Sequence, residues 1–199
     1  SSNDFGGVAS VYLKKFSDFS GVEFNYLNYK KTSNLSKAIK KNAVDLYFDS
    51  QNIESKYDEI NTLINTNIAI IAPKDNYIAI DSFASLKGNT VYALENSNVY
   101  YYLKNLDNIN LKTYSSDNEL LRLKNKDVLI AMDNIAFDYY VNHGLEKFSL
   151  RYSEIIPSAY TFKLNGDATL NKLFAKYINS LDPKVVSYQG LESFTEVRQ

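Results

Sequence analysis

The chain has 199 residues, of which 45% are hydrophobic and 23% charged, and its formal net charge is −1. This composition is ordinary for a globular protein and excludes wholesale disorder, while the scattered lysines offer no basic surface for nucleic acid. The absence of cysteine excludes disulfides and thiolate metal sites, and no apolar run approaches the roughly 20 residues that a membrane-spanning helix needs.

Outside the repeated pattern described below, residues 8–73 predict one helix, two strands and one segment that is a weak helix or a turn. Apolar side chains recur at helical spacing over residues 8–19, which predicts an amphipathic helix. Alternating apolar and polar residues at 22–26 predict a strand with one polar face. Residues 58–64 predict a weak helix or a turn. The apolar run 67–72, broken by Pro73, predicts a buried strand that leaves one core and enters another.

One sequence pattern occurs twice, and the two copies lie about eighty residues apart. Each copy consists of a short helix, a Lys-Asn turn, a buried strand and an aspartate, over residues 35–49 and 120–133. Asn134 then stands where it can cap a helix over residues 135–140. The distance between the copies is too long for a solenoid repeat and suits two similar lobes.

The remaining segments alternate between short strands and helices. The expected elements are a helical turn at 82–88, strands at 91–94 and 109–114, a helix at 99–106, a proline-bearing crossover strand at 155–164 and a helix at 170–181. This alternation, with two crossings between similar halves, predicts an α/β fold of two lobes with a cleft between them. We expect residues 1–72 and 157–199 to form lobe 1 and residues 73–156 to form lobe 2.

Four passages carry a family resemblance: residues 35–49, 85–91, 114–133 and 157–181. The most specific is Leu-Lys-Gly-Asn-Thr-Val at 86–91, which leads into a strand and then a helix start rich in serine and asparagine. Together these passages resemble the family 3 extracellular solute-binding proteins. The resemblance implies a type II periplasmic-binding-protein-like fold with two crossover strands, and binding without catalysis or cofactor.

Three departures from the family pattern bear on the ligand and the fold. Amino-acid binders of this family place a serine or threonine and then an arginine after the first repeated strand, but residues 49–56 contain no arginine. This absence argues against an ordinary α-amino acid. Asp133, in contrast, matches the position at which the family holds an amine. The family's first strand has no counterpart before Gly7: either the given sequence begins after that strand, or the first lobe is built differently, with the C-terminal tail as a candidate to supply it.

The candidate ligand-binding residues follow the predicted strands, because ligands of open α/β sheets sit beyond the carboxyl ends of strands. They are Asp49, Ser50, Gln51, Asn96, Ser97, Asn98, Asp133 and, on the second crossover, Tyr160. The two carboxylates suit an amine, since ionised carboxylates accept strong hydrogen bonds; alternatively each only caps the next helix or turn. The helix start at 96–98 suits an anionic group, with plain capping as the favoured alternative.

Charge then predicts the kind of solute. Asp49 and Asp133 would place two negative charges in one cleft, with Lys56 as the nearest substitute for the missing arginine. Amines, zwitterions or neutral polar molecules are therefore expected in preference to dicarboxylates.

No catalytic pattern accompanies these residues. The only histidine, His143, lies beside Gly144 at an expected helix end, and a phosphate loop, a nucleophile turn and a metal-ligand cluster are missing. We expect an extracellular or periplasmic sensory domain of a membrane receptor, anchored through parts outside this sequence, whose lobes close on a small polar solute. The alternatives are the solute-capture subunit of an ABC importer, with a permease partner, and, less favoured, an enzyme on the same fold.

Overall fold

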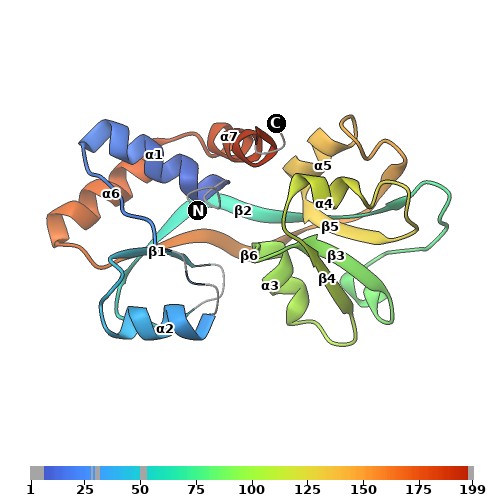
Figure 1. Ribbon diagram of the computed structural model, residues 1–199, viewed down its shortest axis with the longest axis horizontal. Helices are drawn as coiled ribbons and strands as arrows, with labels where there is room; N and C mark the ends of the chain where they lie inside the picture. Colours follow the sequence, from blue (N-terminus) through green and yellow to red (C-terminus); the bar gives the residue numbers. More distant parts are fainter. Residues whose placement is uncertain (1–6, 28, 30–31, 50–52, 197–199) are drawn as a thin grey trace. The chain divides into compact units, whose positions relative to one another are not determined.

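The computed structural model describes residues 7–27, 29, 32–49 and 53–196, without the side chains of residues 32, 157–160 and 193–196. In chain order, its helices and strands are α1 (Val8–Ser20), α2 (Thr32–Lys40), β1 (Leu46–Asp49), β2 (Asp58–Pro73), the 3-10 helix η2 (Phe83–Leu86), β3 (Thr90–Leu94), α3 (Asn98–Lys104), β4 (Asn110–Tyr114), α4 (Asp117–Leu121), β5 (Leu129–Asp133), α5 (Asn134–Tyr140), β6 (Phe148–Leu164), α6 (Ala168–Ser180) and α7 (Pro183–Glu196) (Figure 1).

The strand order is β1-β6-β2-β5-β3-β4. The chain divides into two compact units, of which unit 1 is Ser1–Ile64 with Ala159–Ser193 and unit 2 is Asn65–Ser158 with Phe194–Gln199. The lobe boundaries expected from the sequence stay predictions.

Unit 1 packs α1 and α6 against one face of β1, β6 and the start of β2. β1 runs antiparallel to β6, with Leu46 opposite Leu164 and Asp49 opposite Thr161. Helices α1 and α6 lie side by side (Figure 1). The buried side chains that fill this core are Tyr12, Leu13, Phe16, Ile60, Ile64, Phe162, Leu164, Phe174, Ile178 and Val186. Edge-to-face contacts, such as Phe16 with Phe174 at 5.0 Å between ring centroids, add to the apolar burial.

A second, smaller cluster belongs to the α2 side of unit 1. It joins Ile39 of α2 to Tyr47 of β1 and to Tyr57, which directly precedes β2. The Tyr57 hydroxyl donates to the carbonyl of Val44 at 2.5 Å, so the polar end of a mostly buried ring is satisfied. The first copy of the repeated pattern therefore folds as helix, turn and strand, as predicted.

Unit 2 is built on a mixed sheet. β3 runs parallel to both β4 and β5, whereas β5 runs antiparallel to β2 in a register that places Ile68 opposite Asp133. Helix α3 covers one face of this sheet through Val99 and Leu103. The other buried members of this core are Ile68, Ile70, Ala72, Ile80, Phe83, Leu86, Val91, Ala93, Leu129, Ala131 and Ile156.

Most predicted elements are confirmed to within a few residues. These are the helices expected at 8–19, 35–39, 99–106, 135–140 and 170–181 and the strands expected at 91–94 and 109–114. The helical turn at 82–88 is η2, and Gly88 follows it at φ 76°, a left-handed conformation that glycine adopts without strain.

The long strand β2 shows that the weak helix or turn expected at 58–64 is wrong. Ile60, Thr62 and Ile64 are buried, while the residues between them are exposed. This period of two identifies a half-buried strand, and it runs without a break into the apolar segment that the sequence did predict. The second crossover is also longer than expected, because β6 begins at Phe148.

The strand expected at 22–26 is absent from the described residues. Gly21 ends α1 in the left-handed conformation, and the segment after it is irregular. Val22 and Phe24 alternate because both pack partly against the core of unit 1, without a neighbouring strand to pair with. The alternation of apolar and polar residues at 22–26 therefore reflects burial against this core and not pairing with another strand.

The tail forms the helix α7, so the expectation that it supplies a missing strand is wrong. Pro183 stands at the first helical position, where the missing N–H has no cost. Gly190 allows α7 to approach the start of α1 closely, because a Cβ at this position would lie 2.8 Å from the backbone nitrogen of Val8. Among the described residues, no helix is long and apolar enough to cross a membrane.

Candidate functional site

Asp133 lies at the carboxyl end of β5 and is also the N-cap of α5. Its Oδ1 accepts a hydrogen bond from the backbone N–H of Ile135 at 3.0 Å. The expectation that Asn134 caps this helix is wrong, because Asp133 keeps the extended conformation (φ −60°, ψ 140°) that a cap requires. The strand and the helix together fix the position of this carboxylate.

The environment of Asp133 disfavours its charge. Burial raises the pKa of this carboxyl group from its ordinary 3.8 to about 6, and the nearby Asp138 acts in the same direction, while the Ile135 N–H partly opposes them. Within the described part of the chain, no lysine, arginine or histidine forms an ion pair with Asp133. A half-buried carboxylate that has one hydrogen bond and no ion-pair partner among the described residues is suited to receive a cationic group.

Asn98 opens α3 and points toward β2. Its Nδ2 donates to Thr66 Oγ1 at 3.1 Å, and only 4% of Asn98 and 0% of Thr66 are exposed. The side-chain oxygen of Asn98 is buried and has no hydrogen-bond donor among the described residues. Sequence reasoning selected Asn98 but missed Thr66, since a lone threonine just before the strand expected at 67–72 gives no signal of its own.

The other two residues of this helix start serve the local structure. Ser97 is the N-cap of α3, where its Oγ accepts from the Tyr100 N–H at 3.1 Å and donates to the Leu94 carbonyl at 2.7 Å. Asn96 is exposed, has φ 59°, and accepts from the Tyr101 hydroxyl at 2.9 Å. Capping, the alternative favoured on sequence grounds, accounts for the contacts of Ser97.

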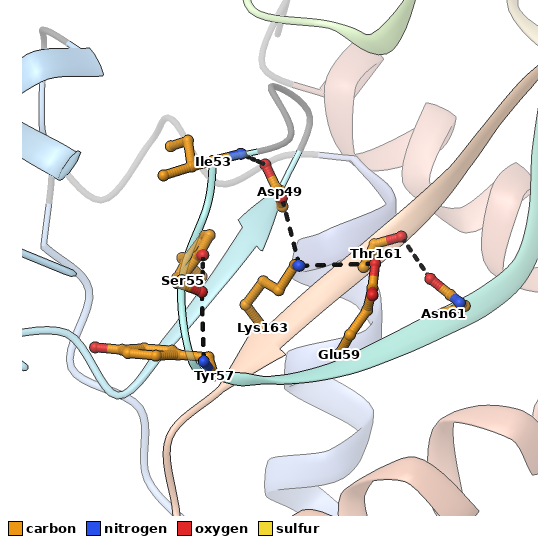
Figure 2. Close-up of polar contacts among 9 residues, drawn as sticks. Asp49, Ile53, Ser55, Tyr57, Glu59, Asn61, Thr161 and Lys163 are labelled. Atoms are coloured by element: carbon orange, nitrogen blue, oxygen red, sulfur yellow. Dashed lines mark hydrogen bonds and ion pairs between the residues drawn. The ribbon is translucent and has the colours of Figure 1, made fainter. Parts of the chain in front are cut away.

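In unit 1, Asp49 lies in a polar cluster at the end of β1 (Figure 2). Its Oδ1 accepts from the Ile53 N–H at 3.2 Å, and its Oδ2 lies 4.0 Å from Lys163 Nζ. Lys163 also pairs with Glu59 at 3.7 Å, and next to this pair Thr161 donates to Asn61 at 2.9 Å. All these side chains lie on the face of the strands opposite to the α1 and α6 core, because they alternate with Phe162 and Leu164.

Lys163 changes the charge argument made from the sequence. Asp49 was expected to carry an uncompensated charge with Lys56 as the nearest cation, but Lys163 of β6 is its ion-pair partner. A signal was present: a lysine between Phe162 and Leu164 in an otherwise apolar crossover is unusual unless an acid faces it. Asp49 is thus held within unit 1, which leaves Asp133 as the stronger candidate for a ligand cation.

For three of the candidate residues, the side chain is not among those that the structure describes. Ser50 and Gln51 are not among the described residues, and Tyr160 belongs to β6 but its side chain is not described. In the described ranges, no group of three or more His, Cys, Asp or Glu residues is arranged to hold a metal ion. His143 stacks on Tyr139 at 4.1 Å between ring centroids, and its Nδ1 lies 2.8 Å from the Tyr139 carbonyl, in keeping with the expected position at a helix end.

The sequence matches no protein-family model and no curated protein. Solved structures do resemble the fold. The periplasmic VFT2 domain of BvgS from Bordetella pertussis has a TM-score of 0.61 at 17% identity, over 95% of this chain and 83% of that chain. An ancestral arginine-binding protein bound to arginine has a TM-score of 0.61 at 16% identity, over 94% and 85% of the two chains.

The holo form of ArgBP from T. maritima is similar as well, with a TM-score of 0.58 at 14% identity over 87% of this chain and 76% of that chain. This chain has a two-lobed, periplasmic-binding-type Venus flytrap fold. The α/β architecture implied by the family resemblance is thereby confirmed, and the structural neighbours are binding proteins and a periplasmic domain. Within this Venus flytrap fold, Asp133 ends β5, a strand that pairs in parallel with β3, at the edge where α/β proteins bind ligands.

Proposed function

We propose that this Venus flytrap chain is a non-catalytic, extracytoplasmic domain that binds a small polar solute and holds its cationic amine at Asp133. One observation carries the proposal: a half-buried carboxylate with a raised pKa and no ion-pair partner among the described residues stands at the carboxyl end of β5. An ammonium group would supply the missing positive charge and several N–H donors, which favours the ionised carboxylate.

A capping role alone does not account for this environment. Asp167 is also a helix N-cap, of α6; it accepts from the Leu170 N–H at 2.8 Å, and it is exposed. A cap therefore needs no burial. The partial burial that raises the pKa of Asp133 costs stability at neutral pH, and functional sites are where such costs are retained.

We further propose that the chain is the sensory domain of a membrane receptor, with lobe closure as the response to the solute. Support comes from the likeness to the BvgS periplasmic domain, of which a larger solved form is matched over 96% of this chain and 38% of that chain. The likeness to arginine-bound binding proteins supports the alternative of an importer's capture subunit with a permease partner. The full-length gene separates the two, because a membrane helix followed by a signalling domain belongs to the receptor alone.

The experiment is a thermal-shift screen of the purified chain against amines, zwitterions, sugars, nucleosides and dicarboxylates, followed by calorimetric titration of each hit. We expect amine-bearing solutes to stabilise the protein and to be recovered unchanged after incubation. Asp133→Asn is expected to weaken binding by about 1.5 to 3 kcal/mol, the size of a hydrogen bond to a charged group, while Asp167→Asn leaves binding unchanged. Stabilisation by dicarboxylates alone, or turnover of the solute, would contradict the proposal.

A further inference from the structure

The Thr66–Asn98 pair is a polar site within the apolar core of unit 2. Thr66 of β2 and Asn98 of α3 border the core formed by Ile68, Val99 and their neighbours, and both are almost completely buried. Thr66 Oγ1 accepts a hydrogen bond from the side-chain amide N–H of Asn98. The side-chain oxygen of Asn98 has no hydrogen-bond donor among the described residues. Buried polar atoms are almost always hydrogen-bonded, and an orphaned acceptor in a core is destabilising.

The sheet register brings this pair toward Asp133. Ile68 lies directly opposite Asp133, and Thr66 precedes Ile68 by two residues on the same strand. Residues two apart on a strand share a face, so Thr66 and Asp133 project from the same face at diagonal positions, where Cα atoms are about 7–8 Å apart. A ligand group a few ångströms across that lies between Thr66 and Asp133 is therefore able to contact both side chains.

We propose that Thr66 and Asn98 determine specificity by supplying acceptors for the additional N–H groups of a primary ammonium whose charge is held by Asp133. A primary ammonium has three N–H donors, and the Asp133 carboxylate, the Asn98 oxygen and the Thr66 hydroxyl provide three acceptor groups. A quaternary ammonium of equal charge has no N–H and leaves the Asn98 oxygen unsatisfied. This inference rests on the proposed function and specifies the solute class.

The test uses ethanolamine and its N-methyl, N,N-dimethyl and N,N,N-trimethyl derivatives, which keep the positive charge and lose one donor at each step. Calorimetric titration of the wild type is expected to show affinity falling about tenfold or more across the series, the effect of lost hydrogen bonds to a buried polar site. In the double variant Thr66→Val/Asn98→Leu, the four affinities are expected to lie within about threefold of one another.

A second measurement needs no ligand. Replacing both partners by apolar groups of similar shape removes the orphaned acceptor, so the melting temperature of the double variant is expected to equal or exceed that of the wild type. The matched control is Asn171→Leu, because Asn171 is equally buried but donates to Asp58 at 2.6 Å and accepts from the Gly166 N–H at 3.2 Å. This control is expected to melt at a lower temperature.

Each outcome is decisive. A melting temperature for the double variant that falls as far as that of Asn171→Leu, a methylation dependence that survives in the variant, or tight binding of the trimethyl derivative by the wild type overturns the inference. If the whole series fails to bind while another solute class binds, the inference fails and a binding function stands. If no solute of any class binds, the proposed function fails as well.

Discussion

Removal of the Asp133 charge is expected to stabilise the ligand-free protein. The raised pKa means that the folded protein binds a proton at Asp133 more tightly than the unfolded chain does. The stabilising contribution of the protonated group is complete below about pH 4 and is lost as the pH rises through about 6. A shift of about two units corresponds to about 3 kcal/mol, so ionised Asp133 lowers the free energy of unfolding by up to that amount at pH 7.

Asp133→Asn keeps a good helix cap and removes the charge. We therefore expect urea unfolding to show a gain of up to about 3 kcal/mol for the variant at pH 7 and nearly none at pH 4. Asp167→Asn, the exposed cap, is expected to change stability by less than about 0.5 kcal/mol at both pH values. A variant that is less stable than the wild type at pH 7, or a gain that does not depend on pH, would refute the electrostatic reasoning.

Two further predictions concern unit 1. Lys163→Met removes the ion pair between Lys163 and the buried Asp49, and it is expected to lower the free energy of unfolding by up to about 3 kcal/mol. The double variant Asp49→Asn/Lys163→Met is expected to recover most of that loss in urea titration, and an equal loss in the single and the double variant would show that the two residues are not coupled. Gly190→Ala places a Cβ 2.8 Å from the Val8 nitrogen and is expected to lower the free energy of unfolding by about 1–3 kcal/mol. The control Ser187→Ala, on the same helix, is expected to lower it by less. An unchanged melting temperature for Gly190→Ala would mean that α7 does not pack on α1 this closely.

Sequence patterns predicted most of the fold where local signals agreed with tertiary structure. Amphipathic spacing located α1, α3 and α6, and the repeated pattern located the two strands that end at Asp49 and Asp133. The wrong predictions of secondary structure arose where one sequence pattern is compatible with two kinds of element. Residues 58–64 carry too few apolar side chains to identify a strand by themselves, and their period of two is visible only as burial on β2.

The candidate site was predictable in part. Asp133 ends a strand and Asn98 comes after one, and both positions can be predicted from the sequence. Thr66 and Lys163 were missed because their roles depend on partners distant in sequence: Thr66 meets Asn98 across 32 residues, and Lys163 meets Asp49 only through the pairing of β6 with β1. No local sequence pattern encodes such a long-range contact, since strand register is set by the whole sheet.

The central claim is that an amine is bound at Asp133, and the most direct measurement is a crystal structure of the protein with the tightest amine from the screen. The account predicts the ammonium nitrogen within hydrogen-bonding distance, about 2.7–3.2 Å, of both the Asp133 carboxylate and the Asn98 side-chain oxygen. A solute that binds elsewhere, or one that directs a carboxylate or an apolar group toward Asp133, would contradict it.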